Sequence, residues 1–189
     1  MLFNLGDLVD RSQNPDATAI IDCIDWENPP RYTHGDIDRL ACSVASGLSK
    51  RGFSHGQRIG ILAANRTEFL AAYFGIMRAG LVAVPINHKF PRATIEFVLA
   101  DAEIRLVFCD ATRRALLPAG VKSVEFDAEW PSFLGAPEFA TVRPQPGATA
   151  MILYTSGSTG RPKGVPLDHA GHLWTVRSRL NGGPFPPPG

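Results

Sequence analysis

The residues with the clearest chemical potential lie in one short run, Tyr154 to Val165, which reads YTSGSTGRPKGV. Glycine permits positive φ angles and close approach of the backbone, so successive N–H groups can point at one anion. Ser156, Ser158 and Thr159 add hydroxyl donors, and Lys163 adds a positive charge on a long side chain. Such a run suits a polyphosphate. The alternative is a hairpin turn or a flexible linker, which is what most Gly/Ser-rich runs are.

The Walker A motif is one phosphate loop that can be compared directly, because its pattern is G-x-x-x-x-G-K-[ST]. Gly157 and Lys163 have the required separation, but Pro162 precedes the lysine and Gly164 follows it in place of a hydroxyl residue. Proline lacks an N–H group and pushes Arg161 away from helical dihedral angles. The sequence therefore disfavours a P-loop kinase or ATPase.

The elements that must position this run are predicted from the apolar pattern. Short apolar runs, near-continuous rather than alternating, indicate strands that are buried on both faces. Helical periodicity separates several of them. The predicted strands are residues 17–25 with 31–34, and then 58–64, 81–86, 104–110, 121–127, 150–154 and 164–168. This order predicts an α/β fold with a mostly parallel sheet and helices on both faces.

Helix boundaries are predicted from capping residues. Thr33 with Asp36 has the spacing of an N-cap with an acid in the first turn. Asn65 is predicted to cap the next helix, Pro91 to open a third, and Asp168 to cap the helix that runs through Leu180. Residues 131–147, which are rich in proline and glycine, are predicted to form a surface connection inside one domain.

Composition excludes several classes of partner. The 189 residues carry a net charge of +1 and no block of basic residues, so we expect no nucleic-acid or anionic-membrane partner. We also expect no transmembrane segment. The three cysteines lie far apart, which fits buried thiols in a cytoplasmic protein. The five histidines lack ligand spacing, so we predict no metal site from them, and His169 is predicted to be a helix-terminus residue.

The run YTSGSTGRPKGV resembles the signature phosphate loop of the AMP-forming adenylate enzymes. This superfamily includes acyl- and aryl-CoA synthetases, adenylation domains of peptide synthetases, and firefly luciferase. The likeness includes Pro162, Lys163 and Gly164, and it extends over the chain from about Ala17 to Leu180. The segment AVPINHKFPRATIEFVLADAEIRLVFCD is more similar to CoA synthetases than to peptide synthetases.

The resemblance implies an ATP-dependent acid–thiol ligase that forms an acyl-adenylate, releases pyrophosphate and AMP, and passes the acyl group to CoA. It implies ATP, Mg²⁺ and CoA as reactants, a small carboxylic acid as substrate, and a place in fatty acid metabolism. Arg161 faces either phosphate or solvent. The residues implied as contacts to the β- and γ-phosphates are Thr155, Ser156, Gly157, Ser158, Thr159, Gly160 and Lys163.

Members of this family are much longer than 189 residues. The residues with which they bind Mg²⁺, adenine and ribose, and their catalytic lysine, follow the phosphate loop in the sequence. Residues 1–189 are therefore expected to be the incomplete N-terminal part of the AMP-binding domain. Alone, this part is expected to be inactive, with an open edge on the strand at 150–154. The alternative is a non-catalytic module that binds a nucleotide or a partner. The sequence leaves the acid and the oligomeric state open.

Overall fold

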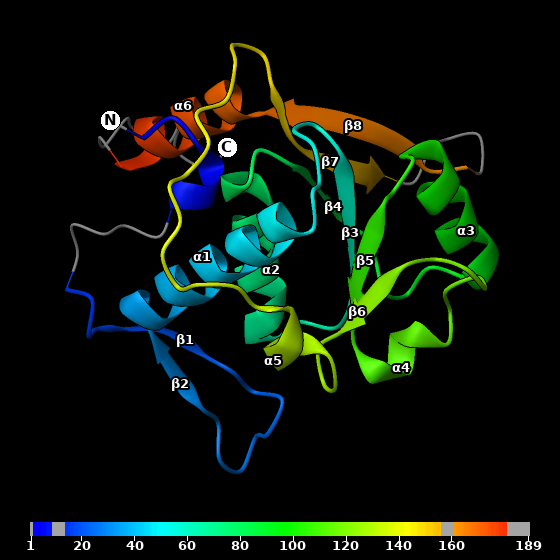
Figure 1. Ribbon diagram of the computed structural model, residues 1–189, viewed down its shortest axis with the longest axis horizontal. Coiled ribbons are helices and arrows are strands. Elements are labelled where there is room, and N and C mark those ends of the chain that lie inside the picture. The colour runs from blue at the N-terminus through cyan, green and yellow to red at the C-terminus, as the bar shows by residue number, and fades with distance from the viewer. Residues whose placement is uncertain (1, 9–13, 156–160, 181–189) are drawn as a thin grey trace, which may run out of the picture.

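The computed structural model describes residues 2–8, 14–155 and 161–180. Its centre is a six-stranded sheet with the order β6-β5-β3-β4-β7-β8 (Figure 1). The strands from β6 to β7 run parallel to their neighbours, whereas β8 runs antiparallel to β7. The strand bounds are β3 Arg58–Leu62, β4 Val82–Pro85, β5 Leu106–Cys109, β6 Ser123–Glu125, β7 Thr149–Thr155 and β8 Lys163–Asp168.

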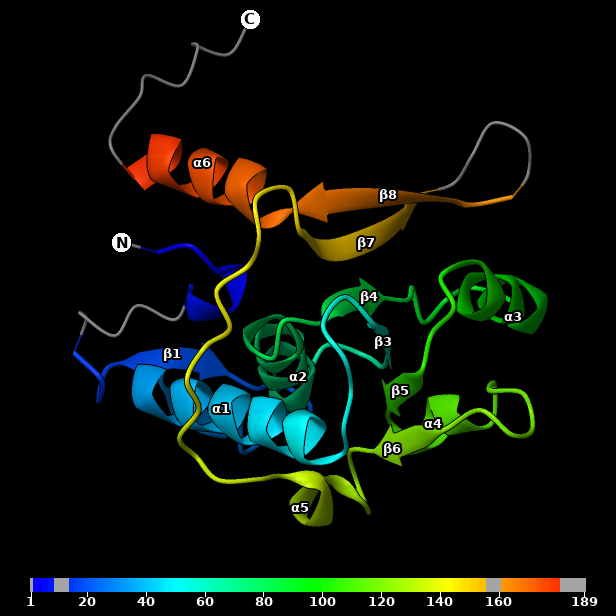
Figure 2. The same cartoon turned by 45° about the horizontal axis from the view of Figure 1, so that its top comes forward.

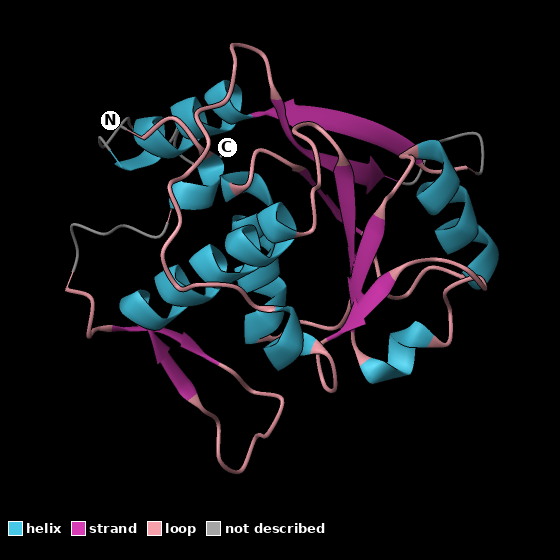
Figure 3. Cartoon of the chain, in the orientation of Figure 1, coloured by secondary structure: helices cyan, strands magenta, loops and turns pink. Residues whose placement is uncertain are grey.

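Helices cover both faces of this sheet, which confirms the predicted fold class (Figures 2 and 3). Helices α1 and α2 pack on one face, and α3 packs on the other with α4 nearby. A separate two-stranded sheet, β1 with β2, lies beside α1. The remaining bounds are η1 Leu5–Asp7, β1 Thr18–Ile21, β2 Arg31–Thr33, α1 His34–Lys50, α2 Thr67–Arg78, α3 Arg92–Asp101, α4 Ala111–Arg114, α5 Trp130–Phe133 and α6 His169–Leu180.

The core is divided by the sheet into two apolar layers. The larger layer joins η1, α1, α2 and α5 to the sheet, and Phe108 of β5 lies there against Phe126, Trp130 and Phe133. The smaller layer lies under α3. Strand β5 is buried along its whole length, as expected for a strand between two helical layers.

The capping predictions have mixed outcomes. Thr33 and Asp36 form a reciprocal capping box at α1, and Asp168 Oδ1 accepts a hydrogen bond of 2.6 Å from Gly171 N in α6, so both predictions are confirmed. The prediction for Asn65 is wrong, because the N-cap of α2 lies one residue later. The first N–H group of that helix, from Thr67, donates over 2.8 Å to Asp22, a carboxylate from the segment after β1.

The segment predicted as a surface connection crosses α1 and α2. Its first residues belong to α5, and residues 134–147 form no helix or strand. Gly135 N donates to Ser43 O over 2.8 Å, and Val142 N donates to Arg78 O over 2.9 Å. Backbone hydrogen bonds therefore fix its path to the two helices before the chain enters β7.

The expectation of an open edge on the strand at 150–154 is wrong, because β7 lies between β4 and β8. Strand β8 itself occupies that edge of the sheet. In the part of the chain described, no helix has both the length and the apolar character needed to cross a membrane.

Candidate functional site

The predicted phosphate contacts lie at the loop end of the β7–β8 hairpin, which is the end that adjoins residues 156–160. Thr155 and Lys163 are directly opposite each other in the antiparallel register, and both are exposed. The structure therefore brings together the two ends of the predicted loop. The other predicted contacts lie outside the described residues, namely Ser156, Gly157, Ser158, Thr159 and Gly160.

The two cations of the run have different surroundings. Lys163 is exposed and forms no ion pair within residues 2–8, 14–155 and 161–180. Arg161 is also exposed, but its guanidinium carbon lies 5.7 Å from the centroid of the Phe97 ring of α3. This distance is typical of a cation–π contact. Arg161 thus has an aromatic neighbour that its sequence context did not predict.

Gly164 has a steric role that sequence reasoning missed. It pairs with Tyr154 across the hairpin. A Cβ atom at this position would lie 3.0 Å from Cζ of Tyr154 and 3.1 Å from Cγ2 of Ile152, closer than side chains normally pack. A signal was present in the sequence, because a glycine inside a strand often marks close packing against a neighbour.

Tyr154 connects the hairpin to α3. Its hydroxyl donates a hydrogen bond of 2.5 Å to Oδ2 of Asp101, the last residue of that helix. Burial raises the pKa of the Tyr154 phenol, and the hydrogen bond and charge of Asp101 raise it further. The phenol therefore stays protonated and donates at neutral pH. Nothing in the sequence pattern singled out Asp101.

The hairpin crosses toward α3 as it leaves the sheet. Strand β7 is the parallel neighbour of β4 and pairs with it through Met151 and Ala83, near the start of β7. Further along the hairpin, Tyr154 and Gly164 line the same cavity as Arg58 and Val82, the first residues of β3 and β4. The hairpin end with Thr155 and Lys163 therefore lies toward the C-terminal end of α3.

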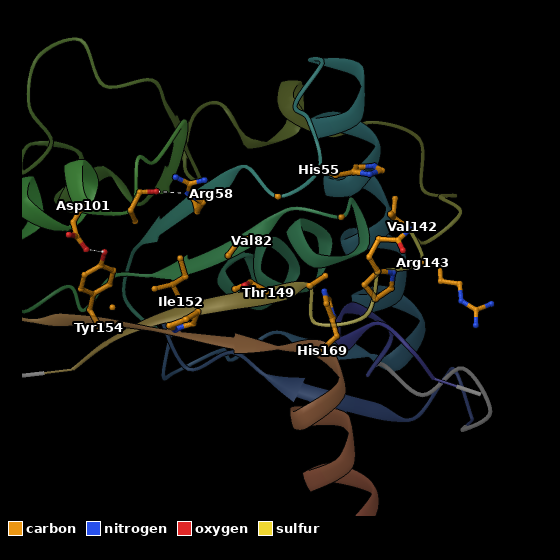
Figure 4. A pocket seen from close by; sticks show the side chains of 18 residues that line it. His55, Arg58, Val82, Asp101, Val142, Arg143, Thr149, Ile152, Tyr154 and His169 are labelled. Atoms are coloured by element: carbon orange, nitrogen blue, oxygen red, sulfur yellow. Dashed lines mark hydrogen bonds between the residues drawn. The ribbon is translucent and has the colours of Figure 1, made fainter.

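A cavity of about 680 Å³ extends from the hairpin toward the start of α6 (Figure 4). Asp101 and Tyr154 lie at one end of it, whereas His55 and His169 lie at the other. His169 is buried at the first position of α6, which confirms its prediction as a helix-terminus residue, and its Nδ1 accepts a hydrogen bond of 3.0 Å from Leu5 N. Burial lowers the pKa of His169, against a smaller opposite effect of Asp168.

The cysteines and the described carboxylates lack the spacing that a metal site requires. All three cysteines are free thiols; Cys42 and Cys109 are buried as predicted, but Cys23 is exposed and corrects that prediction. Among the residues with a described position, no group of three or more His, Cys, Asp or Glu side chains is arranged to hold a metal ion.

Comparison with known proteins gives a consistent result. Residues 9–184 match the family model described as AMP-binding enzyme. The chain is 33% identical over 161 residues to a linear gramicidin synthase of Brevibacillus parabrevis, covering 84% of this chain and 3% of that protein. The ATP-bound crystal structure of MatB from Rhodopseudomonas palustris matches with a TM-score of 0.82 at 26% identity, covering 96% of this chain and 38% of MatB.

A fatty acyl CoA synthetase of Mycobacterium tuberculosis also matches in structure. The TM-score is 0.76 at 25% identity, and the match covers 92% of this chain and 37% of that synthetase. The chain therefore spans well under half the length of each of these proteins.

Proposed function

Because the chain belongs to the AMP-binding enzyme family, we propose that it carries the polyphosphate-binding part of an enzyme that activates a carboxylic acid with ATP. One observation carries this proposal most directly. Thr155 and the exposed cation Lys163 face each other at the loop end of the β7–β8 hairpin, beside the C-terminal end of α3. This is where a leaving pyrophosphate would meet donors and a positive charge.

The proposed reaction has two steps. A carboxylate oxygen attacks the α-phosphorus of ATP, the bond to the β-phosphate oxygen breaks, and pyrophosphate leaves. A thiol then loses its proton to solvent, its sulfur attacks the acyl carbon of the acyl-adenylate, and AMP leaves with the bonding electrons. Lys163 and the donors of residues 155–160 would stabilise the negative charge that develops on pyrophosphate during the first step.

The acid and the thiol define two versions of this proposal. A CoA ligase version is supported by the structural likeness to the fatty acyl CoA synthetase. An amino-acid-activating version, with a carrier-bound thiol, is supported by the sequence likeness to the gramicidin synthase. Both versions share the first step, so both assign the same role to Lys163. A cytoplasmic location, inferred from the widely spaced free cysteines, belongs to the proposal as well.

The first test measures binding of magnesium tripolyphosphate to this chain by isothermal titration calorimetry. Lys163→Ala should weaken binding by roughly ten- to a hundredfold, because a hydrogen bond between charged groups contributes about 1.5–3 kcal/mol. Lys122→Ala is the matched control, because Lys122 is an exposed lysine next to β6 at the opposite edge of the sheet. Equal affinity in all three proteins would contradict the proposal.

The second test follows exchange of labelled pyrophosphate into ATP. A polypeptide that joins this segment to the remainder of the family's domain should exchange in the presence of its acid, and a panel of fatty, aromatic, dicarboxylic and amino acids separates the two versions. We propose that the 189-residue chain alone binds polyphosphate without catalysing exchange. If the chain alone catalyses acid-dependent exchange and Lys163→Ala abolishes it, the claim that the chain alone is inactive is wrong. The same result would support the proposed catalytic role of Lys163. Polyphosphate binding with no exchange in the joined polypeptide would favour a non-catalytic nucleotide-binding module.

A further inference from the structure

Helix α3 contacts both arms of the hairpin that carries the phosphate contacts. Phe97 and Asp101 are four residues apart in α3, so they lie on the same side of the helix. Asp101 contacts Tyr154, one residue before Thr155, and Phe97 contacts Arg161, two residues before Lys163. Figures 1 and 2 both show α3 beside the loop end of the hairpin.

The contact between Tyr154 and Asp101 is well placed to fix the β7 arm. The Tyr154 ring is half-buried against the apolar layer under α3, and its hydroxyl reaches Asp101 over 2.5 Å. Hydrogen bonds to a charged acceptor are shorter and stronger than those between neutral groups. Gly164 leaves the space on the β8 arm that this ring orientation needs, because a Cβ atom there would lie 3.1 Å from the Tyr154 hydroxyl oxygen.

The remainder of the hairpin has less support. Strand β8 is an edge strand and is exposed over most of its length. Leu153 and Val165, which lie on the face of the hairpin opposite to Tyr154, are 36% and 40% exposed. Strand β4 pairs with β7 through Ala83 and Met151, near the base of the hairpin. At the loop end of the hairpin, α3 therefore makes the main described contacts with the two arms.

We propose that α3 positions Thr155 and Lys163, the predicted phosphate contacts that the structure describes, with Asp101 and Phe97 as positioning residues for the β7 and β8 arms. This inference rests on the proposed function, because it assigns a purpose to the spacing between Thr155 and Lys163. Holding a cation in place before the anion arrives lowers the conformational cost of binding. Asp101 acts through Tyr154, and Phe97 acts through Arg161.

The charge of Asp101 makes the proposal easy to distinguish from a simple electrostatic effect. A carboxylate close to an anion site disfavours anion binding, so electrostatics alone predicts that Asp101→Ala tightens polyphosphate binding. Positioning predicts the opposite sign. Asp101→Asn keeps an acceptor oxygen while removing the charge, so it should retain or improve the affinity that Asp101→Ala loses.

The experiment measures the dissociation constant of magnesium tripolyphosphate in the full chain, together with thermal unfolding. Asp101→Ala and Tyr154→Phe should each weaken binding about three- to tenfold, as expected for one lost hydrogen bond, and the double variant should be no weaker than either single one. Phe97→Leu should weaken binding about twofold to fivefold. Glu96→Ala is the matched control, because Glu96 is an exposed carboxylate of α3 whose described partner is Arg92.

The outcomes separate this inference from the function on which it rests. Absence of tripolyphosphate binding by the unmodified chain would reject the proposed function. Binding by the unmodified chain with equal affinity in Asp101→Ala and Tyr154→Phe would overturn the positioning role alone. Additive losses in the double variant, or tighter binding by Asp101→Ala, would overturn it as well. If Asp101→Ala fails to fold, Tyr154→Phe carries the test.

Discussion

The surroundings of Arg78 and the β7–β8 hairpin differ in almost every physical respect. Arg78 ends α2, is completely buried, and donates in several directions, whereas the hairpin carries exposed cations with few described partners. The first region holds elements together, and the second presents groups to solvent. Under the proposed function, this difference is a division of labour between a tightly bonded scaffold and an accessible segment that binds phosphate.

The contacts of Arg78 explain why its charge can be buried. Its guanidinium donates to Gly6 O over 2.8 Å, to Asp38 O over 3.0 Å and to Asp38 Oδ1 over 2.7 Å. It also donates to Cys42 Sγ over 3.0 Å and lies 3.4 Å from Asp7 Oδ1. A buried cation needs such complete partnering, because an unpaired charge in the interior is very costly.

Replacing Arg78 tests the scaffold side of the comparison and should have the largest effect. Arg78→Met keeps most of the side-chain volume but removes the hydrogen bonds that the guanidinium donates to the buried Gly6 carbonyl and to Asp38. We expect unfolding free energy to fall by about 3–5 kcal/mol, as for other broken buried pairs. Urea unfolding followed by circular dichroism measures this loss.

Arg92→Gln is the control for that measurement, since Arg92 forms an exposed i,i+4 pair with Glu96 on α3. Its unfolding free energy should change by less than about 0.5 kcal/mol. The comparison fails if Arg78→Met is as stable as Arg92→Gln. It also fails if Arg78→Met is as stable as the unmodified chain but binds tripolyphosphate more weakly. Arg78 would then belong to the binding region.

Replacing Gly164 tests the hairpin side. Gly164→Ala places a methyl group against the Tyr154 ring and Ile152, so the ring must move away from its position beside Asp101. We expect about 1–2 kcal/mol of destabilisation from this overpacking and about a tenfold loss of tripolyphosphate affinity. Calorimetric titration and thermal unfolding measure the two effects separately.

Val165→Ala provides the matched control, because Val165 is the next residue of β8 and is partly exposed on the other side of the hairpin. It should leave affinity within about twofold of the unmodified chain. A Gly164→Ala variant with unchanged affinity would show that the Tyr154 position does not matter for binding.

The sequence predicts the two regions with unequal success. Buried strands such as β3 and β5 are detectable because burial on both faces leaves an uninterrupted apolar run. The capping box of Thr33 and Asp36 is detectable because both partners lie within one turn. The N-cap of α2 was misplaced because its first N–H group is satisfied by Asp22, 45 residues earlier in the chain.

The candidate site shows the same limit. Thr155 and Lys163 were predicted from a local pattern, and their pairing follows from the hairpin between them. The contacts of Asp101 with Tyr154 and of Phe97 with Arg161 join residues more than 50 positions apart, so no local pattern signals them. Arg78 was missed for a similar reason, because an arginine at a helix C-terminus is usually exposed and interacts with the helix dipole.

The smallest expected effect concerns His169, which links the two regions. His169 begins the helix after the hairpin, and its Nδ1 accepts from Leu5 N next to Gly6, a partner of Arg78. Burial lowers its pKa below the ordinary value of 6.5. The unfolded chain therefore binds a proton at a higher pH than the folded chain, so the stabilisation is present above pH 6.5 and is lost as pH falls through the folded pKa.

Protonation would remove the acceptor that Leu5 N uses, so the loss should be about 0.5–1.5 kcal/mol, similar to one hydrogen bond. Urea unfolding at a series of pH values between about 7 and 4.5 measures this change, in the range where an ordinary histidine titrates. The pKa values of Asp22, Asp36 and Asp127 are lowered from 3.8, so protonation of these carboxylates changes stability at a lower pH than protonation of His169 does. His169→Gln should flatten the histidine step, whereas the matched variant His172→Gln in the same helix should preserve it. If His169→Gln keeps the full pH dependence, the link between the hairpin and the N-terminal segment does not depend on the charge state of this imidazole.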